Sequence, residues 1–129
     1  MSLKLIISGA LGAMGKVIAD AAAADPDFDV IAGIDREDRM DCPFPVYEDP
    51  SNITEKADVI IDFSIPASTP EIIRYALEKK IPAVIGTTGL GERELKLIRS
   101  ASEQIPVFQT GNMSLGVNLQ LELVQLAAS

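Results

Sequence analysis

The stretch that decides the fold is LKLIISGALGAMG, residues Leu3 to Gly15. It joins a short apolar run, Leu3–Ser8, to glycines spaced G-x-x-G-x-x-G at Gly9–Gly15, and a helix-forming run follows at 16–24. Between a strand and a helix, such glycines permit a tight turn and let backbone N–H groups approach a pyrophosphate. The unpaired N–H groups at the helix start attract the anion. The stretch predicts a nucleotide-binding turn, with a plain strand–helix turn as the alternative.

Outward from this turn, apolar runs alternate with helical patterns along the chain. Strands are predicted at 29–34, 45–47, 57–63, 82–86 and 106–110, helices at 68–80, 92–104 and 115–128, and a short helical turn opened by a Ser51 cap at 51–55. Such alternation predicts right-handed crossovers between neighbouring strands. We therefore expect one α/β domain over residues 1–129, with a Rossmann-like, doubly wound, mostly parallel sheet and helices on both faces.

The composition of the chain argues against two classes of binding partner, nucleic acid and membranes. The chain has 129 residues, with 11 Lys and Arg against 19 Asp and Glu, so its net charge of −8 repels nucleic acid and anionic membranes. No apolar run approaches the ~20 residues needed to cross a bilayer, and no secretory signal opens the chain. We expect a cytoplasmic protein that binds neither nucleic acid nor a membrane. The single cysteine, Cys42, is interpreted as an ordinary free thiol, and no metal site is predicted.

A second candidate for cofactor binding is Asp35–Arg36, directly after the predicted 29–34 strand. Asp35 lies 20 residues after Gly15, where the dinucleotide fingerprint places an acid for the adenosine ribose hydroxyls. An aspartate alone favours NAD because it repels a 2′-phosphate, whereas Arg36 would neutralise and bind that phosphate. NADH or NADPH is therefore the expected cofactor. The alternative is a solvated charge pair at a strand end.

Three further polar loops follow predicted strands, at 62–66, 86–89 and 109–118. Parallel strands place their carboxyl ends at one edge of the sheet, where ligands of open α/β sheets bind. The two threonines of the second loop would offer hydroxyl and N–H groups to a nicotinamide, and Asn112 of the third would bind its carboxamide. Asp62 lies in a buried run, which favours a structural carboxylate that caps a neighbouring loop over a catalytic group.

Four segments make the chain resemble a known family, namely GALGAMGKVI, IDFSIPAST, VIGTTGL and TGNMSLGVNL. Their order and approximate separations are those of dihydrodipicolinate reductases, the NAD(P)H-dependent enzymes of bacterial lysine and diaminopimelate synthesis. The resemblance covers essentially the whole chain and implies the amino-terminal, cofactor-binding domain of such a reductase. By this resemblance the dinucleotide contacts would be Gly9, Ala10, Leu11, Gly12, Ala13, Met14, Asp35, Gly86, Thr87, Thr88, Thr110, Gly111, Asn112 and Met113, with Arg36 at the position that meets the 2′-phosphate of NADPH.

The chain departs from the family in two respects. Many members carry an arginine where this chain has Ala13, a loss for which Lys16 would compensate in part. The family's catalytic residues, a histidine pair and a lysine, lie in a second domain that also binds the substrate, and this chain has no histidine. The resemblance thus implies a fragment without catalytic residues and with negligible turnover. Its helix at 115–129 would lead toward the catalytic domain. Family members are typically homotetramers, and the assembly of this chain stays open.

Two alternatives remain at this stage. A stand-alone NAD(H)-binding redox-sensing or regulatory module needs neither a histidine nor a second domain. The predicted helix at 115–128 ends without a clear stop signal, which favours truncation over such a module. A homoserine- or aspartate-dehydrogenase-like first domain shares the glycine loop, but IGTTG together with NMSLGVN argues against it.

Overall fold

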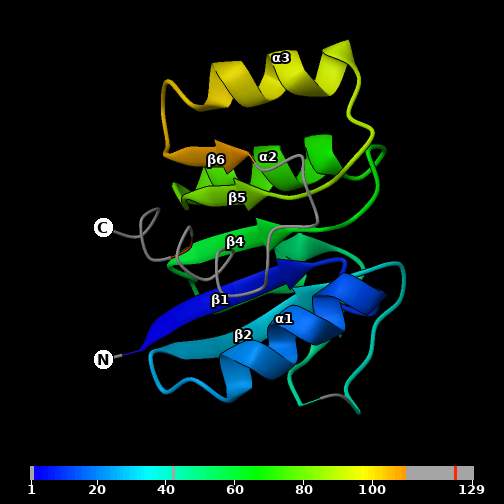
Figure 1. Cartoon of the computed structure of the whole chain (residues 1–129), viewed down its shortest axis with the longest axis vertical. Helices are drawn as coiled ribbons and strands as arrows, with labels where there is room; N and C mark the ends of the chain where they lie inside the picture. Colours follow the sequence, from blue (N-terminus) through cyan, green and yellow to red (C-terminus); the bar gives the residue numbers. More distant parts are fainter. Residues whose placement is uncertain (1, 42, 110–123, 125–129) are drawn as a thin grey trace.

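In the computed structural model, which describes residues 2–41, 43–109 and 124, parallel strands form one six-stranded sheet. The strands are β1 Leu3–Ser8, β2 Phe28–Ile34, β3 Val46–Tyr47, β4 Val59–Asp62, β5 Ala83–Ile85 and β6 Val107–Gln109. Their order is β3-β2-β1-β4-β5-β6 (Figure 1). The direction of winding reverses between β1 and β4, and open α/β sheets bind ligands at this point. The predicted Rossmann-like fold is confirmed.

Helices cover both faces of the sheet and bury it. They are α1 Ala13–Ala23, α2 Thr69–Lys79 and α3 Glu92–Ala101, and α1 lies in front of the sheet in Figure 1. Leu5 and Ile7 of β1 pack in one apolar cluster with Ile18 of α1. Ile6 points to the other face and packs in a second cluster with Ile72 of α2, to which α3 also contributes. Each buried isoleucine contributes roughly 1.5–3 kcal/mol, which fixes the strand ends that carry the loops.

The short helical turn differs from its prediction. A 3-10 turn spans Pro50–Asn52, and its N-cap is Asp49, so the predicted Ser51 cap was wrong. The Asp49 carboxylate accepts hydrogen bonds from the Ser51 N–H at 2.9 Å and from the Ser51 hydroxyl at 2.8 Å. These bonds, the backbone one first, lower the pKa of Asp49 below its ordinary value. Pro50 determines where the turn begins, because proline suits the first helical position, where no N–H is needed, and the N-cap is then Asp49.

Other boundaries shift by a few residues. The first helix begins at Ala13, three residues before the predicted start, so Gly15 lies within its first turn. The predicted helix at 115–128 lies outside the described residues except for Val124, which is fully buried in the α1-side cluster. Cys42 also lies outside them. Among the described helices, none combines the length and apolar character that a membrane span requires.

Candidate nucleotide-binding site

Gly9 turns the chain sharply from β1 toward α1. Its φ is +85°, a conformation that L side chains rarely adopt, and a Cβ here would lie 2.6 Å from the Phe63 carbonyl oxygen. The Gly9 N–H donates to the Ile34 carbonyl oxygen at 2.8 Å. The turn is therefore held between the ends of β2 and β4, and no other residue fits at this position.

The remaining two glycines of the motif have opposite surroundings. Gly15 is buried, and a Cβ here would collide with the Gly9 carbonyl oxygen and lie 2.9 Å from the Ala10 Cα. Gly12 is exposed, and among the described atoms its Cβ would meet only the Gly9 carbonyl oxygen, at 3.4 Å. Gly15 thus serves packing, while Gly12 leaves the backbone bare toward solvent. This is the division of roles that a dinucleotide fingerprint requires.

The start of α1 provides donors for an anion. Gly12 is its N-cap and makes no side-chain hydrogen bond, and no acidic residue lies in the first turn. The first N–H groups of a helix have no acceptor within the helix and carry a partial positive charge. Ala13 and Met14 lie in this turn, and Lys16, three residues after Ala13, has an exposed side chain. A phosphate group that approaches Gly12 would meet these donors.

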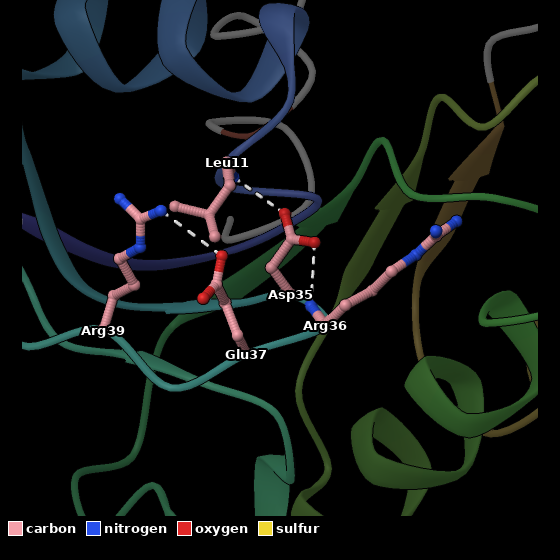
Figure 2. A network of polar contacts seen from close by, with 5 residues as sticks. All are labelled: Leu11, Asp35, Arg36, Glu37 and Arg39. Carbon is pink, nitrogen blue, oxygen red and sulfur yellow. Dashed lines mark hydrogen bonds and ion pairs between the residues drawn. The ribbon is translucent and has the colours of Figure 1, made fainter.

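Asp35 connects the end of β2 with the glycine turn, as Figure 2 shows. One carboxylate oxygen accepts a hydrogen bond from the Leu11 N–H at 2.8 Å, and the other accepts from the Arg36 N–H at 2.8 Å. The Arg36 side chain is exposed and extends away from the neighbouring ion pair of Glu37 and Arg39. The acid predicted from spacing therefore lies against the glycine turn, with a cation beside it.

A cleft of about 590 Å³ opens along this edge of the sheet. Of the predicted site residues, it is lined by Gly9, Leu11, Gly12, Asp35 and Arg36. Its volume is within the range typical of small-molecule and cofactor sites. The structure thus brings the glycine turn and Asp35–Arg36 together in one cavity.

Acidic side chains dominate the charged lining of the cleft. Asp35, Glu37, Glu48 and Glu71 contribute carboxylates, against the Arg36 guanidinium. Within residues 2–41, 43–109 and 124, no three His, Cys, Asp or Glu side chains are grouped so as to hold a metal ion. Glu37, Glu48 and Glu71 were not among the predicted site residues. The sheet-edge rule would find Glu48, which follows β3, whereas Glu71 lies within α2 and carries no comparable signal.

The other predicted site residues that the structure describes are not part of the cleft lining. Ala10 is only 4% exposed, so its side chain belongs to the core and only its backbone faces the turn. Gly86 and Thr87 follow β5 and are buried, while Thr88 is exposed. The Thr87 hydroxyl donates to the Asp62 carboxylate at 3.0 Å, so it points at β4 rather than at a ligand. The predicted contacts at 110–113 lie outside the described residues.

Comparisons with known proteins agree with this geometry. The family model described as "Dihydrodipicolinate reductase, N-terminus" matches residues 3–113. The 4-hydroxy-tetrahydrodipicolinate reductase of Caldanaerobacter subterraneus subsp. tengcongensis is 48% identical over 99% of this chain and 51% of its own length. That of Clostridium tetani is 36% identical over 92% of the chain and 47% of its own length. The chain thus spans about half the length of the curated relatives it matches.

Solved structures share the fold. A dipicolinate-bound dihydrodipicolinate reductase from Paenisporosarcina sp. TG-14 superposes with a TM-score of 0.73 and 23% identity, covering 99% of this chain and 54% of that one. GenD2 from gentamicin A biosynthesis, in complex with NAD, has a TM-score of 0.69 and 18% identity, covering 86% of this chain and 35% of that one. At such identities the likeness shows the Rossmann-like architecture alone.

Proposed function

Because this chain belongs to the dihydrodipicolinate reductase family, we propose that residues 1–129 form its NAD(P)H-binding domain. The observation that carries the proposal is the contrast between the three glycines. At Gly9 and Gly15 a side chain would clash with neighbouring backbone atoms, so only glycine fits there. At Gly12 there is room for a side chain, and the residue is nevertheless glycine. The missing side chain at Gly12 lets a pyrophosphate approach the backbone at the start of α1, and it has no role in packing.

The residues present fit a dinucleotide along the cleft. The N–H groups at the start of α1 would hold the pyrophosphate next to Gly12. Asp35 would accept hydrogen bonds from the ribose hydroxyls, because a carboxylate has about four acceptor sites and Leu11 and Arg36 use two of them. When bound, the cofactor supplies a hydride. The chain's own residues hold it at the carboxyl edge of the sheet and fix its orientation.

For the whole reductase we propose hydride transfer to a dihydrodipicolinate-type substrate, which yields tetrahydrodipicolinate. We propose that a second domain binds the substrate, since the chain covers only about half the length of its relatives. An acid must protonate the substrate as the hydride arrives, and the chain contains no histidine for that role. We therefore propose that the 129 residues bind the cofactor but do not turn over substrate.

Calorimetric titration of the chain with NADH, followed by a reductase assay, tests this proposal. We expect saturable binding in the micromolar range and no NADH oxidation in the presence of substrate. The intact natural gene product, purified from its source, should oxidise NADH under the same conditions. Turnover by the 129 residues alone would refute the proposed division of labour. Binding without turnover in the intact product would favour a redox-sensing module instead.

Arg36→Ala is expected to weaken NADPH binding about tenfold and to change NADH binding less than about twofold. A guanidinium–phosphate hydrogen bond contributes roughly 1.5–3 kcal/mol, here reduced because the side chain is exposed. Since the surrounding carboxylates repel a 2′-phosphate, NADH should already be the tighter ligand of the unmodified chain. Parallel titrations with both cofactors measure these ratios.

The matched control for this substitution is Arg39→Ala, which removes an exposed cation three residues away that pairs with Glu37 at 3.3 Å. It should lower the affinities for both cofactors by similar small factors. If Arg36→Ala weakens NADH and NADPH binding equally, then Arg36 does not contact the 2′-phosphate.

A further inference from the structure

Asp62, at the carboxyl end of β4, is a fully buried acid at the centre of the sheet edge. Its exposed fraction is 0%, and among the described residues no lysine or arginine forms an ion pair with it. Burial of a carboxylate costs several kcal/mol unless hydrogen bonds replace its lost hydration. The residue therefore requires an explanation in terms of its donors.

Donors from the protein fill the acceptor sites of this carboxylate. One oxygen accepts from the Ser64 N–H at 3.0 Å and the Ser64 hydroxyl at 2.5 Å. The other accepts from the Thr69 hydroxyl at 2.9 Å and the Thr87 hydroxyl at 3.0 Å. A carboxylate has about four acceptor sites, so these bonds leave little capacity for substrate or water. Asp62 is accordingly built to hold protein groups in place.

The groups that it holds include the loop after β5. Besides the Thr87 hydroxyl, the Gly86 N–H donates to the Asp62 carbonyl oxygen at 2.8 Å. A Cβ on Gly86 would lie 2.5 Å from Cζ of Phe63, so that ring packs directly over the loop. Two consecutive residues are thus fixed to the end of β4. Their position also fixes that of the exposed Thr88, which follows.

We propose that Asp62 is a positioning residue for the nicotinamide half of the bound dinucleotide, acting through Gly86–Thr88. This inference rests on the proposed function. Hydrogen bonds to an ionised carboxylate are roughly twice as strong as neutral ones, so they hold the loop in its binding conformation before the ligand arrives. The adenosine half is assigned to the glycine turn after β1 and to Asp35 after β2, and both lie on the other side of β4 from this loop.

Two isosteric substitutions separate positioning from general stability. Thr87→Val and Thr69→Val each remove one hydroxyl donor to the same Asp62 oxygen. Only Thr87 belongs to the loop after β5, whereas Thr69 is the first residue of α2. Both side chains are buried, so the structural cost of the two substitutions should be similar.

The test compares NADH with ADP-ribose, which lacks the nicotinamide. Thr87→Val is expected to weaken NADH binding by the chain about tenfold and ADP-ribose binding less than about twofold. Thr69→Val should leave the ratio of the two affinities unchanged. Asp62→Asn should reproduce the NADH-selective loss, because an amide cannot accept four hydrogen bonds.

The results of these titrations either support the positioning role of Asp62 or overturn it. If Thr87→Val and Thr69→Val shift the affinity ratio equally, or if Thr87→Val weakens both ligands alike, the positioning role is overturned while the proposed function stands. If the unmodified chain binds neither NADH nor ADP-ribose, the proposed function fails, and the inference fails with it.

Discussion

Gly12→Ala is expected to weaken NADH binding about 100-fold and to leave the thermal unfolding midpoint within about 2 °C of the unmodified chain. The backbone of Gly12 has φ −79° and ψ 171°, which alanine adopts without strain. Among described atoms, the new methyl group would meet only the Gly9 carbonyl oxygen, at 3.4 Å. It would, however, stand where a pyrophosphate must approach the N–H groups at the start of α1.

Calorimetric titration with NADH and thermal unfolding by circular dichroism check both parts of this prediction. If the variant binds NADH with unchanged affinity, the pyrophosphate does not approach the backbone at Gly12. The glycine turn would then be a structural connection between strand and helix, and the proposed site would lose its main support.

Gly15→Ala, the same chemical change three residues later, should have the opposite effect. We expect a loss of about 3 kcal/mol in the free energy of unfolding, which corresponds to a midpoint lower by roughly 10 °C. The added methyl group collides with the Gly9 carbonyl oxygen and crowds the Ala10 Cα at 2.9 Å. These are backbone atoms, so relief requires α1 to move away from the end of β1.

Urea denaturation measures this loss directly, and the Gly12 variant is its matched control. Unchanged stability in Gly15→Ala would mean that α1 packs less closely than the structure indicates. A similar loss of stability in both variants would contradict the separate roles that we assign to the two glycines.

Sequence reasoning predicted the sheet well because its strands are short apolar runs buried on both faces. The first strand was predicted at its observed bounds, Leu3–Ser8. The start of α1 was not, because Gly12 and Gly15 weaken the helix signal there, and close packing of Gly15 on the turn decides the boundary. The cap of the short turn was misassigned because Asp49 and Ser51 both suit the role and Pro50 chooses between them.

The candidate site was predictable where it depends on spacing along the chain. Asp35 was identified from its separation from the glycines, but its bond to the Leu11 N–H is a tertiary contact that no spacing reveals. Asp62 was predicted to be a structural carboxylate that caps a neighbouring loop, and its bonds to Ser64 and Thr87 confirm this. The direction of the Thr87 hydroxyl escaped prediction, because it follows from burial of an acid on the adjacent strand.

Amide chemical shifts of the ¹⁵N-labelled chain during titration with NADH test the central claim most directly. We predict that the largest changes fall on three segments, namely Gly9–Met14, Asp35–Arg36 and Gly86–Thr88. These segments lie far apart in sequence and meet only at the carboxyl edge of the sheet. Saturable shifts confined to other parts of the chain, or no shifts at millimolar NADH, would contradict the assignment of this edge as the dinucleotide site.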